Sequence, residues 1–103
     1  MLFGMDHAAV GVIRVNDSGL VEAANLKACE LLGYRRSELL GTPIFDIDRD
    51  LTEETWREDR EANRDKGTRR FQSYHVRKDG TEYPVEVTVA RVDFEEAEYY
   101  FSF

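Results

Sequence analysis

Residues 81–92 alternate between apolar and polar side chains, and this pattern restricts the chain to folds with a half-buried β-sheet. The apolar side chains stand at every second position, as Tyr83, Val85, Val87 and Val89. Because successive side chains of a strand point to opposite faces, one face of this strand is predicted to meet a core and the other to meet water. The preceding segment, 69–77, joins it through a Lys78-Asp79-Gly80 turn, which predicts an antiparallel hairpin.

Three further segments are predicted to be strands. Residues 10–15 and 20–24 flank Asn16-Asp17-Ser18-Gly19, whose members tolerate turn dihedrals, so they predict a second hairpin. Residues 98–103 place Tyr99, Phe101 and Phe103 on one face of a last strand and Tyr100 on the other.

The apolar period changes from that of a strand to that of a helix at Asn25. Leu26, Cys29 and Leu32 recur at helical spacing, Asn25 is predicted to cap the start of this helix, and Gly33 is predicted to end it. Ser37 is expected to cap a further helical turn over 38–40, before Thr42-Pro43 makes the chain extended. The middle of the chain is therefore predicted to hold short helical pieces.

The longest helix is predicted over 51–66. Asp50 and Glu53 have capping-box spacing, and Lys66-Gly67 suits a helix end. Only Trp56 and Ala62 are apolar between 52 and 66, so this helix can bury only a narrow stripe. We expect Trp56 to anchor it to the core.

The order of these elements predicts the fold class. Two strands, several helices and three strands in succession favour an α+β fold, in which an antiparallel sheet carries short helices on one face. The 103 residues suffice for one domain, with a lead-in over 1–9 and a core over 10–103.

The charge and the cysteine content indicate which binding partners and which cellular compartment to expect. The net charge is −7 at pH 7, which disfavours nucleic acid and anionic membranes as partners. The sequence has neither an apolar run of about 20 residues nor a secretion signal, and it is predicted to be soluble. Its single cysteine, Cys29, favours a cytoplasmic location.

Three segments resemble the PAS family of sensory domains, also called sensory box domains. They are NDSGLVEAAN at 16–25, LLGYRRSELLG at 31–41 and RKDGTEYPVEV at 77–87, and they stand in the family's order. The resemblance extends from about Ala8 to Phe103. It implies a five-stranded antiparallel sheet that cups a small pocket under short helices.

The resemblance also implies a function. Such a module binds a small ligand or relays a signal to an output domain of a larger protein, such as the histidine kinase of a two-component system or a cyclic-dinucleotide enzyme. The domain itself is then non-catalytic. The alternative is a ligand-free module that only dimerises or docks its parent protein, which the polar helix over 51–66 favours. An enzyme that uses Cys29 or His75 is a third hypothesis, for which no nucleophile, base and orienting group can be assembled.

The cofactors of the family can be tested against the residues that each one needs. Haem-binding relatives usually supply a histidine from the long helix, and 51–66 contains none. Flavin photosensors carry a cysteine where this chain has Gly41-Thr42-Pro43-Ile44-Phe45-Asp46, and the photoactive yellow protein branch carries one where it has Gly67-Thr68-Arg69. We therefore predict no haem and no covalent flavin, and a small polar ligand is the remaining class.

No metal site is predicted. Asp46, Asp48 and Asp50 mimic the first positions of a calcium loop, but Leu51 and Arg57 stand where that loop requires Gly and Glu.

Seven residues are candidates for the lining of a ligand pocket, and for each of them ordinary core packing is the alternative. They are Asn25, Cys29, Tyr34, Ile44, Phe45, Trp56 and His75. Cys29 is either an oxidant-sensing thiol or a small core residue. His75 is either a ligand contact that titrates near neutral pH or a hydrogen-bonded residue of a strand.

The outer face of the sheet is a candidate interface. Val10, Val12 and Tyr100 are predicted to form an apolar patch that the short amino-terminal segment cannot cover. We expect a homodimer through this face, and the alternative cover is an amino-terminal helix or a neighbouring domain.

Overall fold

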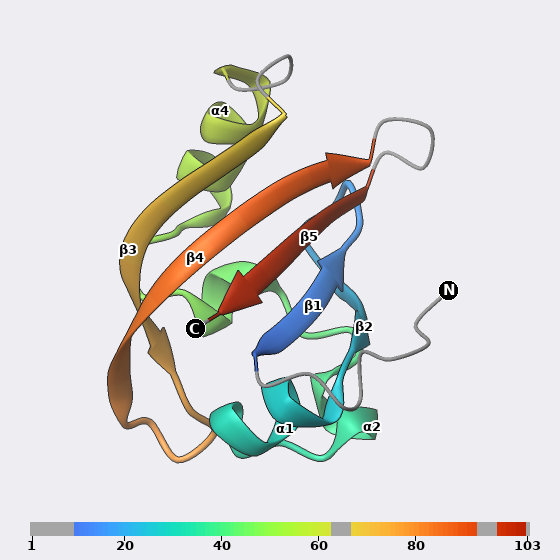
Figure 1. The fold of residues 1–103 in the computed structure, drawn as a ribbon, viewed down its shortest axis with the longest axis vertical. Coiled ribbons are helices and arrows are strands. Elements are labelled where there is room, and N and C mark those ends of the chain that lie inside the picture. The colour runs from blue at the N-terminus through green and yellow to red at the C-terminus, as the bar shows by residue number, and fades with distance from the viewer. Residues whose placement is uncertain (1–9, 63–66, 93–96, 103) are drawn as a thin grey trace.

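The computed structural model describes residues 10–62, 67–92 and 97–102 (Figure 1). The chain begins with a hairpin of two strands, β1 (Gly11–Val15) and β2 (Val21–Ala24). Helices follow as α1 (Leu26–Leu32), α2 (Arg36–Leu39), α3 (Ile44–Ile47) and α4 (Glu53–Ala62). The remaining strands are β3 (Thr68–Val76), β4 (Glu82–Val92) and β5 (Ala97–Ser102). The α+β prediction is confirmed, whereas the predicted lead-in over 1–9 lies outside the described residues.

The strands form one antiparallel sheet in the order β2-β1-β5-β4-β3. The last strand therefore lies in the middle, where it pairs with both β1 and β4 (Figure 1). One edge strand is β2, and the other is β3, beside which α4 runs. The sheet thus links β3 to the first hairpin only through β4 and β5.

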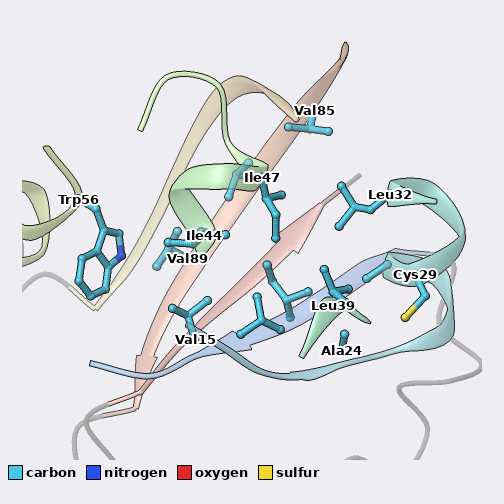
Figure 2. Close-up of a cluster of buried hydrophobic side chains, with 14 residues drawn as sticks. Val15, Ala24, Cys29, Leu32, Leu39, Ile44, Ile47, Trp56, Val85 and Val89 are labelled. Carbon is cyan, nitrogen blue, oxygen red and sulfur yellow. The ribbon is translucent and has the colours of Figure 1, made fainter. Parts of the chain in front are cut away.

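The core lies between the sheet and the helices (Figure 2). Val85, Val87 and Val89 are buried, while Pro84 and Glu86 at the alternate positions are exposed, which confirms the alternation predicted for this strand. The helices bury one apolar group or more each, among them Leu32, Leu39, Ile44, Ile47 and Trp56.

Asn25 and Gly33 bound α1 as predicted. The Asn25 Oδ1 accepts a hydrogen bond from the Ala28 N–H at 2.9 Å, and Gly33 ends the helix with φ of 77°. That positive φ is the left-handed conformation in which glycine commonly ends a helix.

The start of α2 differs from the prediction. The helix begins at Arg36 instead of following Ser37, because the Glu38 side chain accepts a hydrogen bond from the Arg35 N–H at 2.9 Å. A carboxylate three residues into the helix thus satisfies the backbone donor that precedes it.

The start of α4 also differs. The helix begins at Glu53, after a reciprocal pair of hydrogen bonds in which Thr52 N–H donates to Thr55 Oγ1 and Thr55 N–H donates to Thr52 Oγ1. Asp50, predicted to be the cap, instead lies against β3. The helix is described to Ala62, and residues 63–66 of the predicted helix lie outside the described residues.

Tyr100 was predicted to lie on the outer face of the sheet, and the register of the strands corrects this prediction. Tyr100 pairs with Ile13 in β1 and with Val89 in β4, and both of these residues belong to the core. Paired residues of antiparallel strands share a face, so the position of Tyr100 belongs to the inner face and that of Phe101, opposite Val12, to the outer face. The prediction counted residues along β5 without knowing which strands flank it.

In the part of the chain that the structure describes, no helix has the length and apolarity needed to cross a membrane.

Candidate functional site

Two hollows border the edge strand β3. The first, which we call the α4–β3 groove, has a volume of about 610 Å³. Its walls are Asp50, Leu51, Thr55, Asp59 and residues 69–73. The second, which we call the β3–β4 hollow, has a volume of about 490 Å³ and is lined by Asp50, Gln72, Ser73, Tyr74, Pro84, Val85 and Glu86. Asp50, Gln72 and Ser73 line both.

The polarity of α4 explains why a groove separates this helix from β3. Trp56 is the one buried side chain of α4. The helix is also held by charged contacts, from Arg60 Nη1 to the Asp17 carbonyl at 2.7 Å and from Arg69 Nη1 to Asp59 Oδ2 at 2.6 Å. A helix with a single apolar anchor has no apolar face to press along a strand, so space is left beside it.

The groove combines a charged rim with an apolar floor. Arg70 and Gln72 are exposed at the rim, Asp50 contributes a carboxylate, and Leu51 and Phe71 are partly buried beneath them. The guanidinium can donate hydrogen bonds to a ligand, and the carboxylate can accept them. The apolar floor suits a short carbon skeleton. These residues therefore suit a small molecule that carries polar groups.

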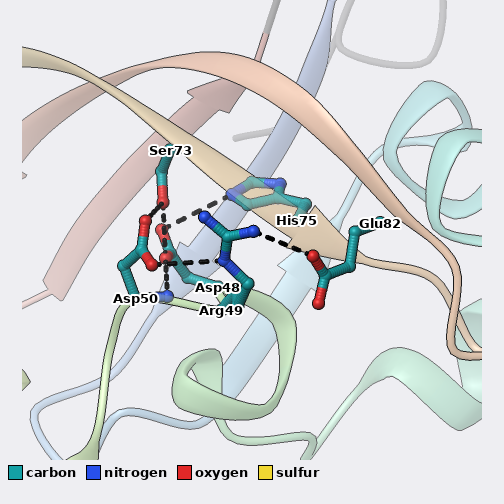
Figure 3. Close-up of polar contacts among 6 residues, drawn as sticks. All are labelled: Asp48, Arg49, Asp50, Ser73, His75 and Glu82. Atoms are coloured by element: carbon teal, nitrogen blue, oxygen red, sulfur yellow. Dashed lines mark hydrogen bonds and ion pairs between the residues drawn. The ribbon is translucent and has the colours of Figure 1, made fainter.

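Two residues of the groove, Asp50 and Ser73, belong to a polar cluster with the buried Asp48 and His75 (Figure 3). Ser73 Oγ donates to Asp48 Oδ1 at 2.6 Å and lies 3.3 Å from Asp50 Oδ2, while the Asp50 N–H donates to the same Asp48 oxygen at 3.0 Å. The other Asp48 oxygen, Oδ2, lies 3.8 Å from His75 Nε2. The cluster joins the segment after α3 to the inner face of β3.

His75 Nε2 forms no hydrogen bond with any described residue, although the side chain is buried. His75 lies within β3, where it is paired with Tyr83 of β4. Burial lowers the pKa of His75 from its usual 6.5, and the nearby Asp48 carboxylate acts in the opposite direction. The ring packs edge-on against Tyr83, with ring centres 6.1 Å apart.

The seven candidate pocket residues lie in or beside the packed core, and none of them lines the two hollows. Asn25, Cys29, Ile44 and Trp56 are buried, while Tyr34 and Phe45 pack against the core from its margin. His75 borders a cavity of about 10 Å³, which has room for about one water molecule.

The residues of the groove were not identified from the sequence. One signal was present, because β3 places Ser73 and His75 at positions of the same parity as Phe71, which packs against the core. Polar side chains on the inner face of a strand need partners, and here these partners come from the segment after α3.

Among the described residues, no group of three histidine, cysteine or acidic side chains is placed to hold a metal ion. Asp48 and Asp50 both contact Ser73, whereas Asp46 lies apart from them in the first turn of α3.

The sequence pattern of the PAS domain matches residues 8–103. The chain belongs to the PAS domain family. Two of the segments that carried the resemblance form hairpins of this PAS domain, because 16–25 spans the β1–β2 turn, β2 and the cap of α1, and 77–87 spans the β3–β4 turn and half of β4. The third, 31–41, spans the end of α1 and all of α2.

Solved structures share this PAS fold. The PAS domain of an HTR-like protein from Haloarcula marismortui is 25% identical, with a TM-score of 0.88, 99% of this chain covered and 90% of that one. A domain of a sensory box sensor histidine kinase/response regulator from Geobacter sulfurreducens is 19% identical, with a TM-score of 0.81 and coverage of 96% and 86%. The PAS domain of a LuxR-family transcriptional regulator from Burkholderia thailandensis, solved in complex with ethanol, is 16% identical, with a TM-score of 0.81 and coverage of 97% and 92%. Among curated proteins, none matches the chain.

Proposed function

We propose that this PAS domain is a cytoplasmic sensory module that binds a small polar ligand in the α4–β3 groove and relays binding to an output domain of a larger protein. The observation that carries the proposal is the groove itself, about 610 Å³ in volume and bordered by Arg70, Gln72 and Asp50 over an apolar floor. Its size and mixed lining are those of a small-molecule site. The PAS domain of the Burkholderia regulator, with its bound ethanol, supports a small polar ligand.

A relay from the groove follows the strand order. A ligand that contacts both walls draws α4 towards β3 and favours one arrangement of the two over the other. Since β3 pairs with β4 and β4 pairs with β5, the change passes through the sheet to the last strand. The histidine kinase among the similar structures supports an output domain of that class.

The module itself is proposed to be non-catalytic. Its buried thiol, Cys29, lies in the core cluster, and the charged group beside His75 is the carboxylate of Asp48, 3.8 Å from Nε2. Neither group faces the groove, so a substrate there would meet no nucleophile or base of this pair.

Mass spectrometry tests the proposal. The native spectrum of the purified domain is compared with the spectrum after denaturation, and a mass excess that denaturation removes reports a bound small molecule. We expect Arg70→Gln, which removes a charge from the groove, to lose this excess. Arg57→Gln is the control, since Arg57 pairs with Glu53 on α4 and does not line the groove. An excess that Arg70→Gln retains would contradict the groove as the site.

A ligand-free dimerisation or docking module is the second candidate. It is favoured by the small volume, about 10 Å³, of the cavity that His75 borders. Dimerisation through the outer face of the sheet would draw on Val10, which is partly buried, more than on Val12, which is only 4% exposed. A dimer with no mass excess in the native spectrum would favour this candidate over the sensor.

A further inference from the structure

His75 and Asp48 are two buried titratable side chains that face one another across a short gap. Each residue is 2% exposed, and 3.8 Å separates His75 Nε2 from Asp48 Oδ2. This separation exceeds the length of a hydrogen bond, and no group of the described residues forms a hydrogen bond with Nε2. A neutral imidazole therefore leaves a buried nitrogen unsatisfied beside a carboxylate, whichever ring nitrogen carries the proton.

The groups around His75 leave Asp48 as its nearest charged neighbour. The small cavity beside the ring is lined from β1 by Gly11 and Ile13 and from α1 by Ala28, Leu31 and Leu32, none of which titrates. From β4, the Tyr83 ring meets His75 edge-on, with the Arg77 guanidinium 4.2 Å from the centre of that ring.

The segment after α3 supplies the remaining charges. Arg49 pairs with Glu82 at 3.0 Å and with Asp50 at 3.3 Å, and these contacts are exposed. Asp50 reaches the cluster through Ser73, so it lies on the far side of Asp48 from His75 (Figure 3).

Asp48 also holds two residues of the groove. Its Oδ1 accepts hydrogen bonds from Ser73 Oγ and from the Asp50 N–H. Ser73 and Asp50 line both the α4–β3 groove and the β3–β4 hollow. Asp48 is therefore bonded to two residues that line both hollows.

We propose that His75 and Asp48 form a proton-operated contact that controls the walls of the groove. When the His75 ring takes a proton from solvent, Nε2–H donates to Asp48 Oδ2, and the gap closes to a charge-assisted hydrogen bond. Closure draws the Asp48–Asp50 segment towards β3 and shifts Asp50 and Ser73 with it. This inference rests on the proposed sensory function and adds that acidity is one of the signals to which the module responds.

A buried ion pair between protonated His75 and Asp48 is possible because the alternative, neutral His75, also has a cost in free energy. Neutral His75 leaves Nε2 without a hydrogen bond to any described protein group, whereas the protonated ring gains a bond to a carboxylate that two other donors already orient. Such a contact has two discrete arrangements, as a switch requires.

An NMR titration tests the proposal on the domain without added ligand. The ring signals of His75 and the backbone amides of Asp48, Asp50 and Ser73 are followed from pH 8 to pH 5, the range in which histidine changes charge. We expect His75 to titrate with a midpoint below 6.5 and the three amides to shift with the same midpoint.

Variants separate the contact from other effects. In Asp48→Asn, which still accepts the bonds from Ser73 and Asp50 but lacks the charge, the His75 midpoint is expected to fall further and the amides are expected to stop following it. In His75→Gln, the amide titration is expected to vanish. His7→Gln is the matched control, since His7 is the other histidine in the sequence, and it should leave every midpoint unchanged.

Three results would overturn the proposal. They are a His75 ring that does not titrate in this range, a titrating ring without shifts in the three amides, and amide shifts that persist in His75→Gln. The first two are read from the unaltered domain, so an unfolded variant does not affect them. The test is also distinct from that of the sensory function, because Arg70→Gln should lose a bound ligand yet keep the coupled titration.

Discussion

The ring of Trp56 lies against the ring of Phe45, with centres 6.2 Å apart and planes inclined by 60°. This tilted contact joins α4 to α3 and holds the only side chain that α4 buries. The position of α4, and hence the width of the groove, depends on this single apolar anchor.

Replacement of Trp56 by alanine should destabilise the domain by about 3–5 kcal/mol, as truncation of a buried aromatic side chain does. Urea unfolding followed by circular dichroism measures the loss. Arg57→Ala, at the neighbouring exposed position, is the control and should change the free energy of unfolding by no more than about 0.5 kcal/mol. Equal losses in the two variants would show that Trp56 does not anchor α4.

Asn25 joins β1 to α1, so its loss should affect both elements. Its Oδ1 accepts from the Val12 N–H and the Ala28 N–H, and its Nδ2 donates to the Val10 carbonyl, each at 2.9 Å. Asn25→Ala leaves these groups without their partner, at a cost of about 1–3 kcal/mol for each buried group. Asn25→Ser, which can still cap α1, should recover part of the free energy of unfolding. Identical stabilities for the two variants would contradict a role for the cap.

Gly19 and Gly41 have the same backbone conformation but differ in the space around them. Both have positive φ, 85° and 88°, but a Cβ at Gly19 would lie 2.8 Å from Phe45 Cε1, whereas none of the neighbours of Gly41 lies within 4 Å. Gly41→Ala should lower the free energy of unfolding by about 1–2 kcal/mol, because alanine is strained in the left-handed conformation. Gly19→Ala should cost about 1–3 kcal/mol more, since Phe45 is held by Trp56 and must give way. Equal melting temperatures of the two variants would contradict the close contact.

His75 should make the stability of the domain depend on pH. Because burial lowers its pKa below 6.5, the unfolded chain binds a proton at this residue more readily than the folded chain does. The contribution of His75 is therefore fully present above pH 6.5 and is lost as the pH falls from 6.5 towards the lowered pKa. Urea unfolding at a series of pH values should show this loss, and His75→Gln should flatten the curve in that window. A curve of unchanged slope in the variant would assign the dependence to other groups.

The local pattern of the sequence determined most of the elements. Alternation along 82–89 predicted β4 and its buried face, and Asn25 and Gly33 predicted both ends of α1, because these signals depend only on strand geometry and capping chemistry. The starts of α2 and α4 were displaced, since more than one side chain near each start can satisfy the free backbone donors. Glu38 does so in α2, and Thr52 with Thr55 in α4.

The site was decided by tertiary structure alone. The order of the strands sets the face of Tyr100, because a residue of a middle strand shares its face with the partners on both sides. The groove exists because α4 is held beside β3 by Trp56 and a few charged contacts, and Asp48 meets His75 only because the segment after α3 crosses the edge of β3. The contacts of Asp48 with Ser73 and with His75 join residues that are 25 or more positions apart in the chain. The sequence by itself therefore determined the elements and the family, whereas long-range pairing placed the groove and the buried His75–Asp48 contact.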